Sequence, residues 1–207
     1  MVMDWEKRFR DGQTPWLRSG VNPAFEAWFK GPGALSLRGA KMLVPGFGTA
    51  PESLEAAKLG ALVTGIDIAP TAVAFQQAGF AAAGLDGAFT LGDIVTWRPS
   101  EPFDLIYEQT CLCAIEPAER TAYEALAAAS LKPGGRLHAL FMQNSVRPGG
   151  PPFHCDLAEM RALFHPARWA WPSTPPIRAD HDSLGMFELG FVLNRLPQLA
   201  ARDELSS

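Results

Sequence analysis

Short apolar runs alternate along the chain with segments whose apolar residues recur at helical spacing. The runs expected to form buried strands are 41–45, 61–67, 87–93, 103–108 and 136–142. The segments expected to form helices between these strands each begin at a proline and cover 51–60, 70–77 and 117–131. Strands and helices that alternate in this way predict right-handed crossovers and an open parallel sheet with helices on both faces.

Both ends of the chain show a different pattern. Further helices are expected at 4–10, 23–30 and 156–164. The last of these has Asp156 as its candidate N-cap. Two final strands, 168–171 and 186–193, are joined by a proline-rich loop and suit an antiparallel hairpin at the sheet edge. The pattern therefore predicts an α/β fold with a mainly parallel seven-stranded sheet and a frayed tail at 197–207.

The composition is typical of a compact globular chain, with 47% hydrophobic and 19% charged residues. At 207 residues the chain is expected to form one domain. Its formal net charge is −4, so it lacks the basic footprint that a nucleic-acid backbone requires. We therefore expect a small-molecule partner and no nucleic acid.

The three cysteines, Cys111, Cys113 and Cys155, are too few and too unevenly placed for a disulfide framework, which favours a reducing compartment. The C-x-C pair is not a usual zinc spacing, so no metal is expected. The sequence has no apolar run of about 18 residues, and its first residues, MVMDWEKRFRDG, are too charged for a signal peptide. These features predict a cytoplasmic protein without a membrane segment.

A glycine loop is the first candidate for chemistry. Gly46 and Gly48 follow the strand at 41–45 and precede a helix, which places backbone N–H groups beside the carboxyl ends of the strands. Asp67 ends the next strand, where a carboxylate can accept hydrogen bonds from both hydroxyls of a ribose. Loop and acid together indicate a nucleoside-bearing cofactor. The alternative is a tight turn, with Asp67 capping the following helix.

The loop differs from the fingerprint of a dinucleotide site. That fingerprint has a third glycine for close helix–strand packing, whereas position 51 here is Pro51. Glu52 adds a carboxylate, which repels a pyrophosphate but suits a cationic amino acid. We therefore interpret the loop as a site for S-adenosylmethionine, which has a ribose, an adenine and a sulfonium, rather than for a nicotinamide dinucleotide.

Three later segments support this interpretation. LGD at 91–93 places Asp93 near the adenine amino group and Ile94 against the ring. FDLIYEQT at 103–110 ends where methyl donor and acceptor would meet, and LKPGGRL at 131–137 is a turn common in class I methyltransferases. Each segment has an ordinary alternative, since Asp93 also suits a turn and KPGG also ends helices. Their order and spacing together favour a methyltransferase.

The chain resembles the thiopurine methyltransferase group of class I methyltransferases, which includes members that methylate small thiols, thiocyanate or halide. The resemblance covers nearly the whole chain and is carried by DWEKRFRDGQTPW, LVPGFG, VTGIDIAPTAV, FDLIYEQTCLCAI, LKPGG and GGPPFHCDLAEMRALF. It implies a Rossmann-like fold, S-adenosylmethionine as the cofactor and S-adenosylhomocysteine as the product. It also implies one domain over 1–207, with a helical lid over the cofactor at 1–32, a catalytic core at 33–196 and a tail.

The resemblance implies roles for individual residues. The donor would contact Trp5, Phe9, Trp16, Gly46, Gly48, Asp67, Ile68, Asp93, Ile94 and Glu108. The acceptor would contact Trp16, Gln109, Phe153 and His154. The alternative for the tryptophans is ordinary core packing, because large aromatic side chains are usually buried for their area. Beside a sulfonium the same rings would supply cation–π stabilisation.

The end of the fourth strand departs from the family pattern. Glu108 and Gln109 stand where thiopurine-type members usually have Asp-Arg, and a glutamine cannot neutralise an anionic acceptor. Glu108 is the first candidate for a catalytic base or an acceptor-orienting group; its alternative is to bind backbone N–H groups or the donor. His154 is a second candidate, with a structural alternative. Cys111 and Cys113 are expected to act as small buried hydrophobes.

Sulfur is the acceptor atom that the family analogy indicates, and nitrogen or oxygen of a heteroaromatic compound is the alternative. Two other classes of protein stay open. One is a nicotinamide-dependent oxidoreductase, and the other is a donor-binding protein without catalytic activity. The expected assembly is a monomer or a weak homodimer.

Overall fold

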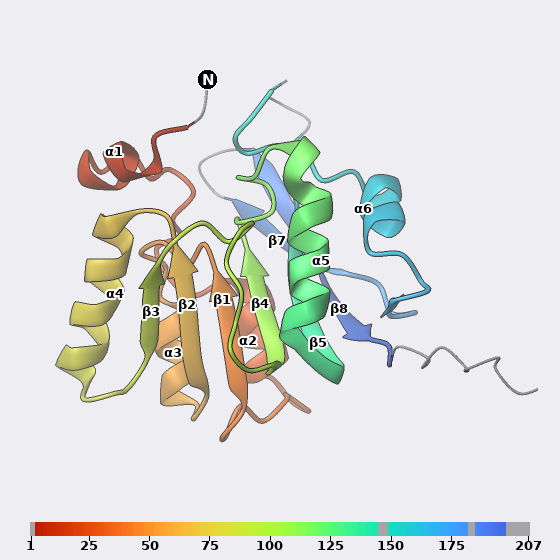
Figure 1. The fold of residues 1–207 in the computed structure, drawn as a ribbon, viewed down its shortest axis with the longest axis horizontal. Coiled ribbons are helices and arrows are strands. Elements are labelled where there is room, and N and C mark those ends of the chain that lie inside the picture. Colours follow the sequence, from red (N-terminus) through yellow and green to blue (C-terminus); the bar gives the residue numbers. More distant parts are fainter. Residues whose placement is uncertain (1–2, 145–148, 182–184, 198–207) are drawn as a thin grey trace, which may run out of the picture.

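The computed structural model describes residues 3–144, 149–181 and 185–197 and shows one mixed sheet with helices packed on both faces (Figure 1). The strands are β1 (Lys41–Pro45), β2 (Leu62–Asp67), β3 (Ala88–Leu91), β4 (Phe103–Gln109), β5 (Leu131–Gln143), β6 (Trp169–Ala170), β7 (Ile177–His181) and β8 (Met186–Arg195). The helices are α1 (Trp5–Arg10), α2 (Pro23–Phe29), α3 (Glu52–Lys58), α4 (Pro70–Ala83), the 3₁₀ turn η1 (Pro117–Glu119), α5 (Arg120–Ser130) and α6 (Leu157–Leu163).

The strand order is β3-β2-β1-β4-β5-β8-β6, and β7 pairs with β8. Strands β1 to β5 are parallel, while β8 runs antiparallel to β5. The chain reverses its direction of winding between β1 and β4, which is the point at which open α/β sheets bind ligands. The mainly parallel sheet with antiparallel C-terminal strands confirms the expected fold class.

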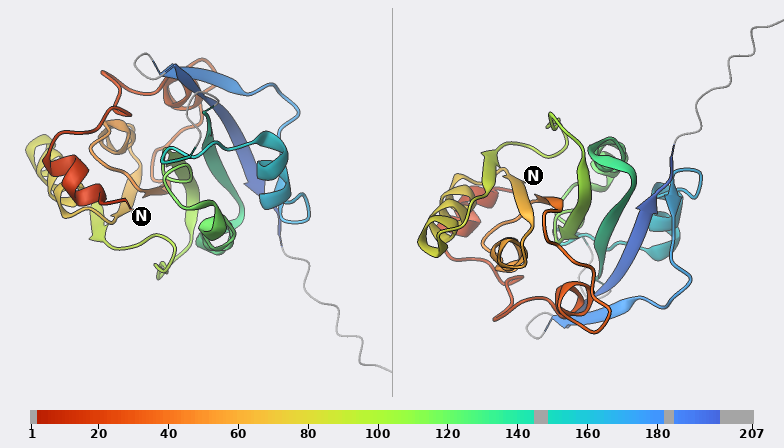
Figure 2. Two further views of the ribbon diagram at one scale, coloured as in Figure 1. Left: turned by 90° about the horizontal axis from the view of Figure 1, so that it is seen from above. Right: turned by 90° about the horizontal axis from the view of Figure 1, so that it is seen from below.

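Successive residues of the central strands serve opposite layers of the core. Met42 and Val44 of β1 pack with the apolar faces of α2, α3 and α4, whereas Leu43 between them packs with α5 and α6. Figure 2 shows the same division, with α3 and α5 on opposite sides of the sheet. A strand covered on both faces needs apolar residues at successive positions, as in the buried run MLVP that follows the partly exposed Lys41.

Two elements extend further than their sequence pattern predicts. Helix α4 continues beyond Gln77 to Ala83 and ends only at Gly84, whose φ of 65° is the left-handed conformation of a helix C-cap. Strand β5 begins at Leu131, so it includes the KPGG segment that was expected to be a turn. Leu131 pairs with Phe103 ahead of a register shift in the β4–β5 ladder, and this long-range pairing draws the segment into the sheet.

The sheet has eight strands in the described residues, not the seven expected. The additional strand, β7, lies in the proline-rich segment that was expected to be a loop, and it forms the hairpin with β8. Strand β6 pairs only with the far end of β8, through Trp169 and Ala170. Because β5 occupies one edge of β8, β6 and β7 share the other edge and together fill one position of the sheet.

Within the described part of the chain, no helix has the length and apolar character that a membrane span requires.

We expect Phe141→Ala to lower the free energy of unfolding by about 3–5 kcal/mol, because it removes a fully buried ring that packs against Phe164, Trp171 and Phe191. Urea denaturation measures this change. Phe75→Ala is the matched control, since Phe75 on α4 is 54% exposed and its loss should change stability by less than about 0.5 kcal/mol. Equal effects of the two substitutions would contradict this assignment of the core.

Candidate active site

A cleft of about 420 Å³ opens at the carboxyl ends of the parallel strands, beneath α1. This volume lies within the range typical of small-molecule sites. The expected site residues along its walls are Trp5, Phe9, Trp16, Gly46, Gly48, Asp67, Ile68, Asp93, Ile94 and Gln109. Segments far apart in the sequence therefore meet around one cavity.

The glycine loop between β1 and α3 requires glycine at both positions. Gly46 and Gly48 have φ values of 55° and 52°, which side-chain-bearing residues rarely adopt. A Cβ at Gly46 would lie 2.9 Å from Sγ of Cys111, and one at Gly48 would lie 3.0 Å from Cζ of Phe9. The loop thus allows the end of β4 and helix α1 to approach its backbone closely.

Asp67 ends β2 as a nearly buried carboxylate, 6% exposed. Its Oδ2 accepts a hydrogen bond from the Gly48 N–H at 2.8 Å, and its Oδ1 accepts one from the Ala69 N–H at 2.9 Å. Each oxygen keeps a further lone pair for a ligand hydroxyl. Removal from water raises the pKa of Asp67, and the two backbone N–H groups partly offset this effect.

Asp93 follows β3, closes a turn and lines the cleft. Its Oδ1 accepts the hydrogen bond that closes the turn, from the Val95 N–H at 2.9 Å. The next residue, Ile94, is buried and faces the same cavity. This segment presents a carboxylate next to an apolar surface, the combination that suits a purine amino group and ring.

An aromatic cluster covers the cleft from the N-terminal side. The rings of Trp5 and Phe9, both on α1, meet Trp16 edge to face, with centroids 5.6 Å and 5.8 Å away. Helix α1 is attached to α4 by Glu6, whose carboxylate accepts hydrogen bonds from the Thr71 backbone N–H at 2.9 Å and its hydroxyl at 2.7 Å. Helix α1 contributes no buried residue, so this attachment is its main polar contact with the core.

The backbone at the end of β4 is strained. Thr110 has a φ of 57°, which is unfavourable for a β-branched residue and marks a functional segment more often than chance. Beside it, Gln109 accepts a hydrogen bond from the Tyr107 hydroxyl at 2.5 Å through Oε1. This bond fixes the orientation of the Gln109 amide and leaves its N–H₂ group as the available donor.

Glu108 does not occupy the position expected of a catalytic base. It is 1% exposed and is not among the residues that line the cleft. Its Oε1 accepts hydrogen bonds from the N–H groups of Cys111 and Leu112 at 3.0 Å and 2.7 Å, so the carboxylate holds the loop after β4. Burial raises the pKa of Glu108 to about 7. Its geometry matches the structural alternative rather than the catalytic role.

Phe153 and His154 also lie outside the cleft lining among the described residues. Phe153 packs under Gly150, where a Cβ would lie 2.3 Å from its ring. His154 accepts the Asn144 backbone N–H at Nδ1, at 3.0 Å. From this loop it is Pro151 and Pro152 that face the cavity, whereas Phe153 is partly buried beside Gly150 and His154 is exposed.

Cys111 and Cys113 are free, buried and part of the cleft wall. Burial raises the pKa of both thiols well above the usual range, so they act as small hydrophobes, as expected, and not as thiolates.

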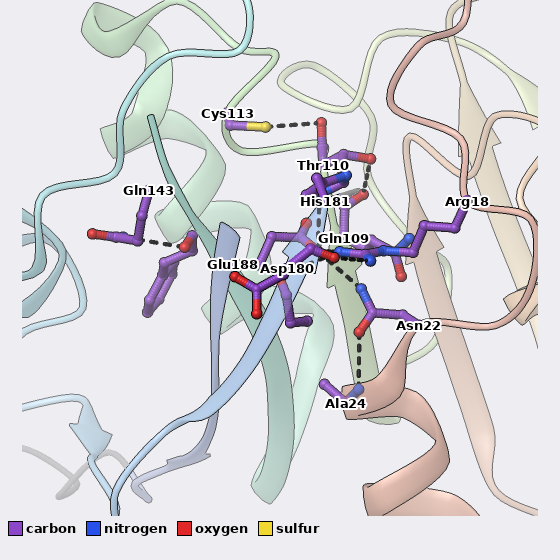
Figure 3. Close-up of polar contacts among 12 residues, drawn as sticks. Arg18, Asn22, Ala24, Gln109, Thr110, Cys113, Gln143, Asp180, His181 and Glu188 are labelled. Atoms are coloured by element: carbon purple, nitrogen blue, oxygen red, sulfur yellow. Dashed lines mark hydrogen bonds and ion pairs between the residues drawn. The ribbon is translucent and has the colours of Figure 1, made fainter. Parts of the chain in front are cut away.

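A polar cluster on the β8 side of the cleft has no counterpart in the sequence expectations. Arg18 donates through Nη2 to Oε2 of Glu188 at 3.1 Å and through Nη1 to the Asp180 carbonyl (Figure 3). Asn22 donates to the same Glu188 oxygen at 2.9 Å, and His181 lies 3.3 Å from it. Arg18 and Met186 line the cleft here. The only local signal was that Arg18 follows the TPW segment closely.

A glycine loop and two acids at the switch point of a parallel sheet define an S-adenosylmethionine-dependent methyltransferase of class I. Solved structures share this fold. The 1,6-didemethyltoxoflavin-N1-methyltransferase of Burkholderia thailandensis superimposes with a TM-score of 0.74 at 19% identity, over 94% of this chain and 86% of that one. The magnesium protoporphyrin IX methyltransferase of Synechocystis, solved with bound S-adenosylhomocysteine, gives 0.67 at 19% identity, over 93% and 88%.

The chain belongs to the thiopurine S-methyltransferase family, whose profile matches residues 2–174. It is 35% identical to the probable thiol methyltransferase 2 of Arabidopsis thaliana, over 78% of this chain and 71% of that protein. It is 34% identical to thiocyanate methyltransferase 1 of Brassica oleracea over the same shares, and 32% identical to the thiopurine S-methyltransferase of Pseudomonas entomophila over 77% and 81%. The protein is therefore an S-adenosylmethionine-dependent methyltransferase.

We expect Glu108→Gln to stabilise the protein above pH 7 by on the order of 2–3 kcal/mol and to leave it unchanged near pH 4.5. The folded pKa is about 7 against an ordinary value of 4.5, so wild-type Glu108 contributes stability below the lower value and loses it as the pH rises through 7. Urea denaturation at pH 4.5, 6 and 8 measures the difference. Asp86→Asn on the exposed α4–β3 connection is the control. A difference independent of pH would contradict the buried, protonated state.

We expect Glu6→Ala to weaken S-adenosylmethionine binding several-fold, because it removes both hydrogen bonds that attach α1 to Thr71. The thermal midpoint should move by less than about 2 °C, since α1 contains no buried residue. Calorimetric titration and thermal unfolding measure the two effects. Asp11→Ala, at the other end of the segment, is the control and should leave affinity unchanged. Unchanged affinity in Glu6→Ala would show that α1 does not contribute to donor binding.

Proposed function

We propose that the protein transfers a methyl group from S-adenosylmethionine to the sulfur atom of a small thiol or heteroaromatic thiol. Relatives named as thiol, thiocyanate and thiopurine methyltransferases support a sulfur acceptor. The observation that carries the proposal is the lining of the cleft on its β5 and β8 side. There the buried Cys113, Met142 and Met186 and the partly buried Ile115 form an apolar wall that contains three sulfur atoms, which suits a soft sulfur nucleophile better than a strongly hydrated one.

The donor half of the cleft lies over β2 and β3. We assign the ribose hydroxyls to Asp67, which has free lone pairs on both carboxylate oxygens, and the adenine to Asp93 and Ile94. The backbone around Gly46 and Gly48 borders the space left for the methionine part. These residues fit S-adenosylmethionine because they offer acceptors to hydroxyl and amino groups and leave the loop backbone accessible.

The bound donor supplies an electrophilic methyl group on a positively charged sulfur. The protein positions the acceptor in line with that methyl group and excludes water, which is the main requirement of a displacement reaction. Trp5, Phe9 and Trp16 close the cleft and present aromatic faces and edges to a cation. We assign acceptor contacts to Trp16, Gln109, Pro151 and Pro152, all of which line the cavity.

We extend the proposal to the domain organisation of the chain, its partners, its cellular compartment and its assembly. We infer one domain over 1–207, with residues 1–32 as a lid and 33–196 as the catalytic core. A net charge of −4 supports a small-molecule acceptor and no nucleic-acid partner. Three free, buried cysteines support a reducing, cytoplasmic compartment. We propose a monomer or a weak homodimer as the working assembly.

Calorimetric titration with S-adenosylmethionine, S-adenosylhomocysteine and NADH tests the cofactor, and a panel of acceptors tests the chemistry. We expect both adenosyl ligands to bind, NADH not to bind, and Asp67→Ala to weaken donor binding by at least about 10-fold through the loss of charge-assisted hydrogen bonds. Asp86→Ala is the control, because Asp86 is exposed and precedes β3, at the amino ends of the parallel strands and away from the cleft.

The acceptor panel comprises an alkanethiol, an arenethiol, thiocyanate, a heteroaromatic amine and a phenol, with methylated products identified by mass spectrometry. Methylation of thiols above the other acceptors supports the proposal. Preferred methylation of nitrogen or oxygen contradicts the sulfur assignment. Donor binding with no methylated product would indicate a donor-binding protein without catalytic activity, and NADH binding alone would contradict the cofactor assignment.

A further inference from the structure

Glu52 is a buried carboxylate with one unused oxygen at the wall of the cleft. It begins α3 directly after the glycine loop, is 2% exposed, and lines the cavity. Its Oε1 accepts a hydrogen bond from the Asn22 backbone N–H at 2.8 Å. Its Oε2 has no hydrogen bond of normal geometry to any described residue. A buried carboxylate oxygen without a partner is costly unless a ligand, a proton or water completes it.

A second, small pocket of about 20 Å³ adjoins Glu52 and shares Gln109 and Thr110 with the main cleft. It is just large enough for one water molecule and has polar side chains around it. Gln109 is oriented by the Tyr107 hydroxyl on its Oε1, and its amide group is near enough to Glu52 to lower the pKa of that carboxylate, but it does not reach Oε2 with normal hydrogen-bond geometry. Glu52 therefore has both an opening to the cleft and room for a water beside it.

The charged groups around Glu52 favour a basic carboxylate. Burial is the largest influence and raises the pKa of Glu52, and the Glu188 carboxylate on β8 raises it further. Arg18 does not neutralise Glu52, because its guanidinium is bound to Glu188 and to the Asp180 carbonyl. His181 on β7 likewise faces Glu188, and Tyr107 on β4 is uncharged, with its pKa raised well above the ordinary value.

Glu52 lies toward the acceptor side of the cleft. The donor acids Asp67 and Asp93 end β2 and follow β3. Glu52 is instead joined to the β8 side, because it accepts a hydrogen bond from the Asn22 backbone N–H. The side-chain amide of Asn22 donates to Glu188 (Figure 3). Gln109, at the end of β4, lines the cavity with it. The carboxylate is thus placed near the point where acceptor and methyl group meet.

We propose that Glu52 is the catalytic base that deprotonates a thiol acceptor; the proposal rests on the proposed function. The S–H bond breaks with its electron pair left on sulfur, and the proton passes to Oε2 of Glu52. The acceptor sulfur then forms a bond to the methyl carbon, while the bond from that carbon to the donor sulfur breaks and its electron pair stays with the donor sulfur. The products are a methyl thioether and uncharged S-adenosylhomocysteine, and water carries the proton away.

The test compares two acceptors in the full-length protein: an alkanethiol that is protonated at pH 7 and an electron-poor arenethiol that is already ionised. We expect Glu52→Gln to lower kcat for the alkanethiol by at least about 100-fold, the usual contribution of a general base. The arenethiolate rate should change by less than about 3-fold. In wild-type protein kcat/KM for the alkanethiol should level off above the Glu52 pKa, whereas in Glu52→Gln it should keep rising with pH until the alkanethiol itself ionises.

Two further variants and a binding measurement keep the test decisive. Glu52→Asp should recover part of the alkanethiol rate and the levelling of the pH profile. Glu55→Gln, one turn further along α3 and paired with Lys30 and Lys58 at the surface, should behave as wild type. Calorimetric titration of Glu52→Gln with S-adenosylmethionine should show affinity within about 3-fold of wild type.

The other outcomes distinguish a failure of the Glu52 proposal from a failure of the proposed function. An equal loss for both acceptors, together with weakened donor binding, would overturn the proposal and assign Glu52 to the cationic amino group of the donor. Unchanged alkanethiol turnover in Glu52→Gln, with wild-type protein active on both thiols, would overturn the proposal and leave the proposed function intact. Wild-type protein that binds the donor but methylates neither thiol would overturn the sulfur assignment and the base together.

Discussion

The hydrogen bond from the Gly48 amide to the Asp67 carboxylate is the contact on which the arrangement of the site depends. It joins the loop after β1 to the end of β2, beside a backbone hydrogen bond from Gly46 to Ile66. Because the loop is held there with positive φ values, Phe9 approaches Gly48 and Cys111 approaches Gly46. Helix α1 and the segment after β4 therefore both pack against the glycine loop, whose position is fixed by this hydrogen bond.

Three buried glutamates near the carboxyl ends of the strands show how local partners separate the roles of identical side chains. Glu108 is held by two backbone N–H groups outside the cleft. Glu188 accepts hydrogen bonds from the side chains of Arg18 and Asn22. Glu52 has one backbone partner and one unused oxygen at the cavity wall. Among the described residues, each of the three keeps one carboxylate oxygen without a hydrogen-bond partner, and Glu52 is the one of them that lines the cleft, where a ligand can reach it.

Much of the donor half of the site was predictable because its residues follow directly from strand ends. Parallel strands bring their carboxyl ends to one edge, so Gly46, Asp67 and Asp93 were expected to converge, and they line one cleft. The acceptor half was less predictable. Glu108 lies outside the cleft lining because its carboxylate accepts the backbone N–H groups that follow β4. In the loop after β5, Pro151 and Pro152 line the cavity in place of Phe153 and His154.

Local periodicity and turn residues were enough to predict the alternation of β1 to β5 with their helices and the glycine loop, and the resemblance of several motifs indicated the family. These features depend on interactions within a few residues, which a single sequence carries directly. The tertiary structure alone decided that β7 pairs with β8, that Arg18 binds Glu188 and that Asn22 connects Glu188 to Glu52. The two contacts to Glu188 join segments more than 100 residues apart, and only the packed sheet brings them within hydrogen-bonding distance.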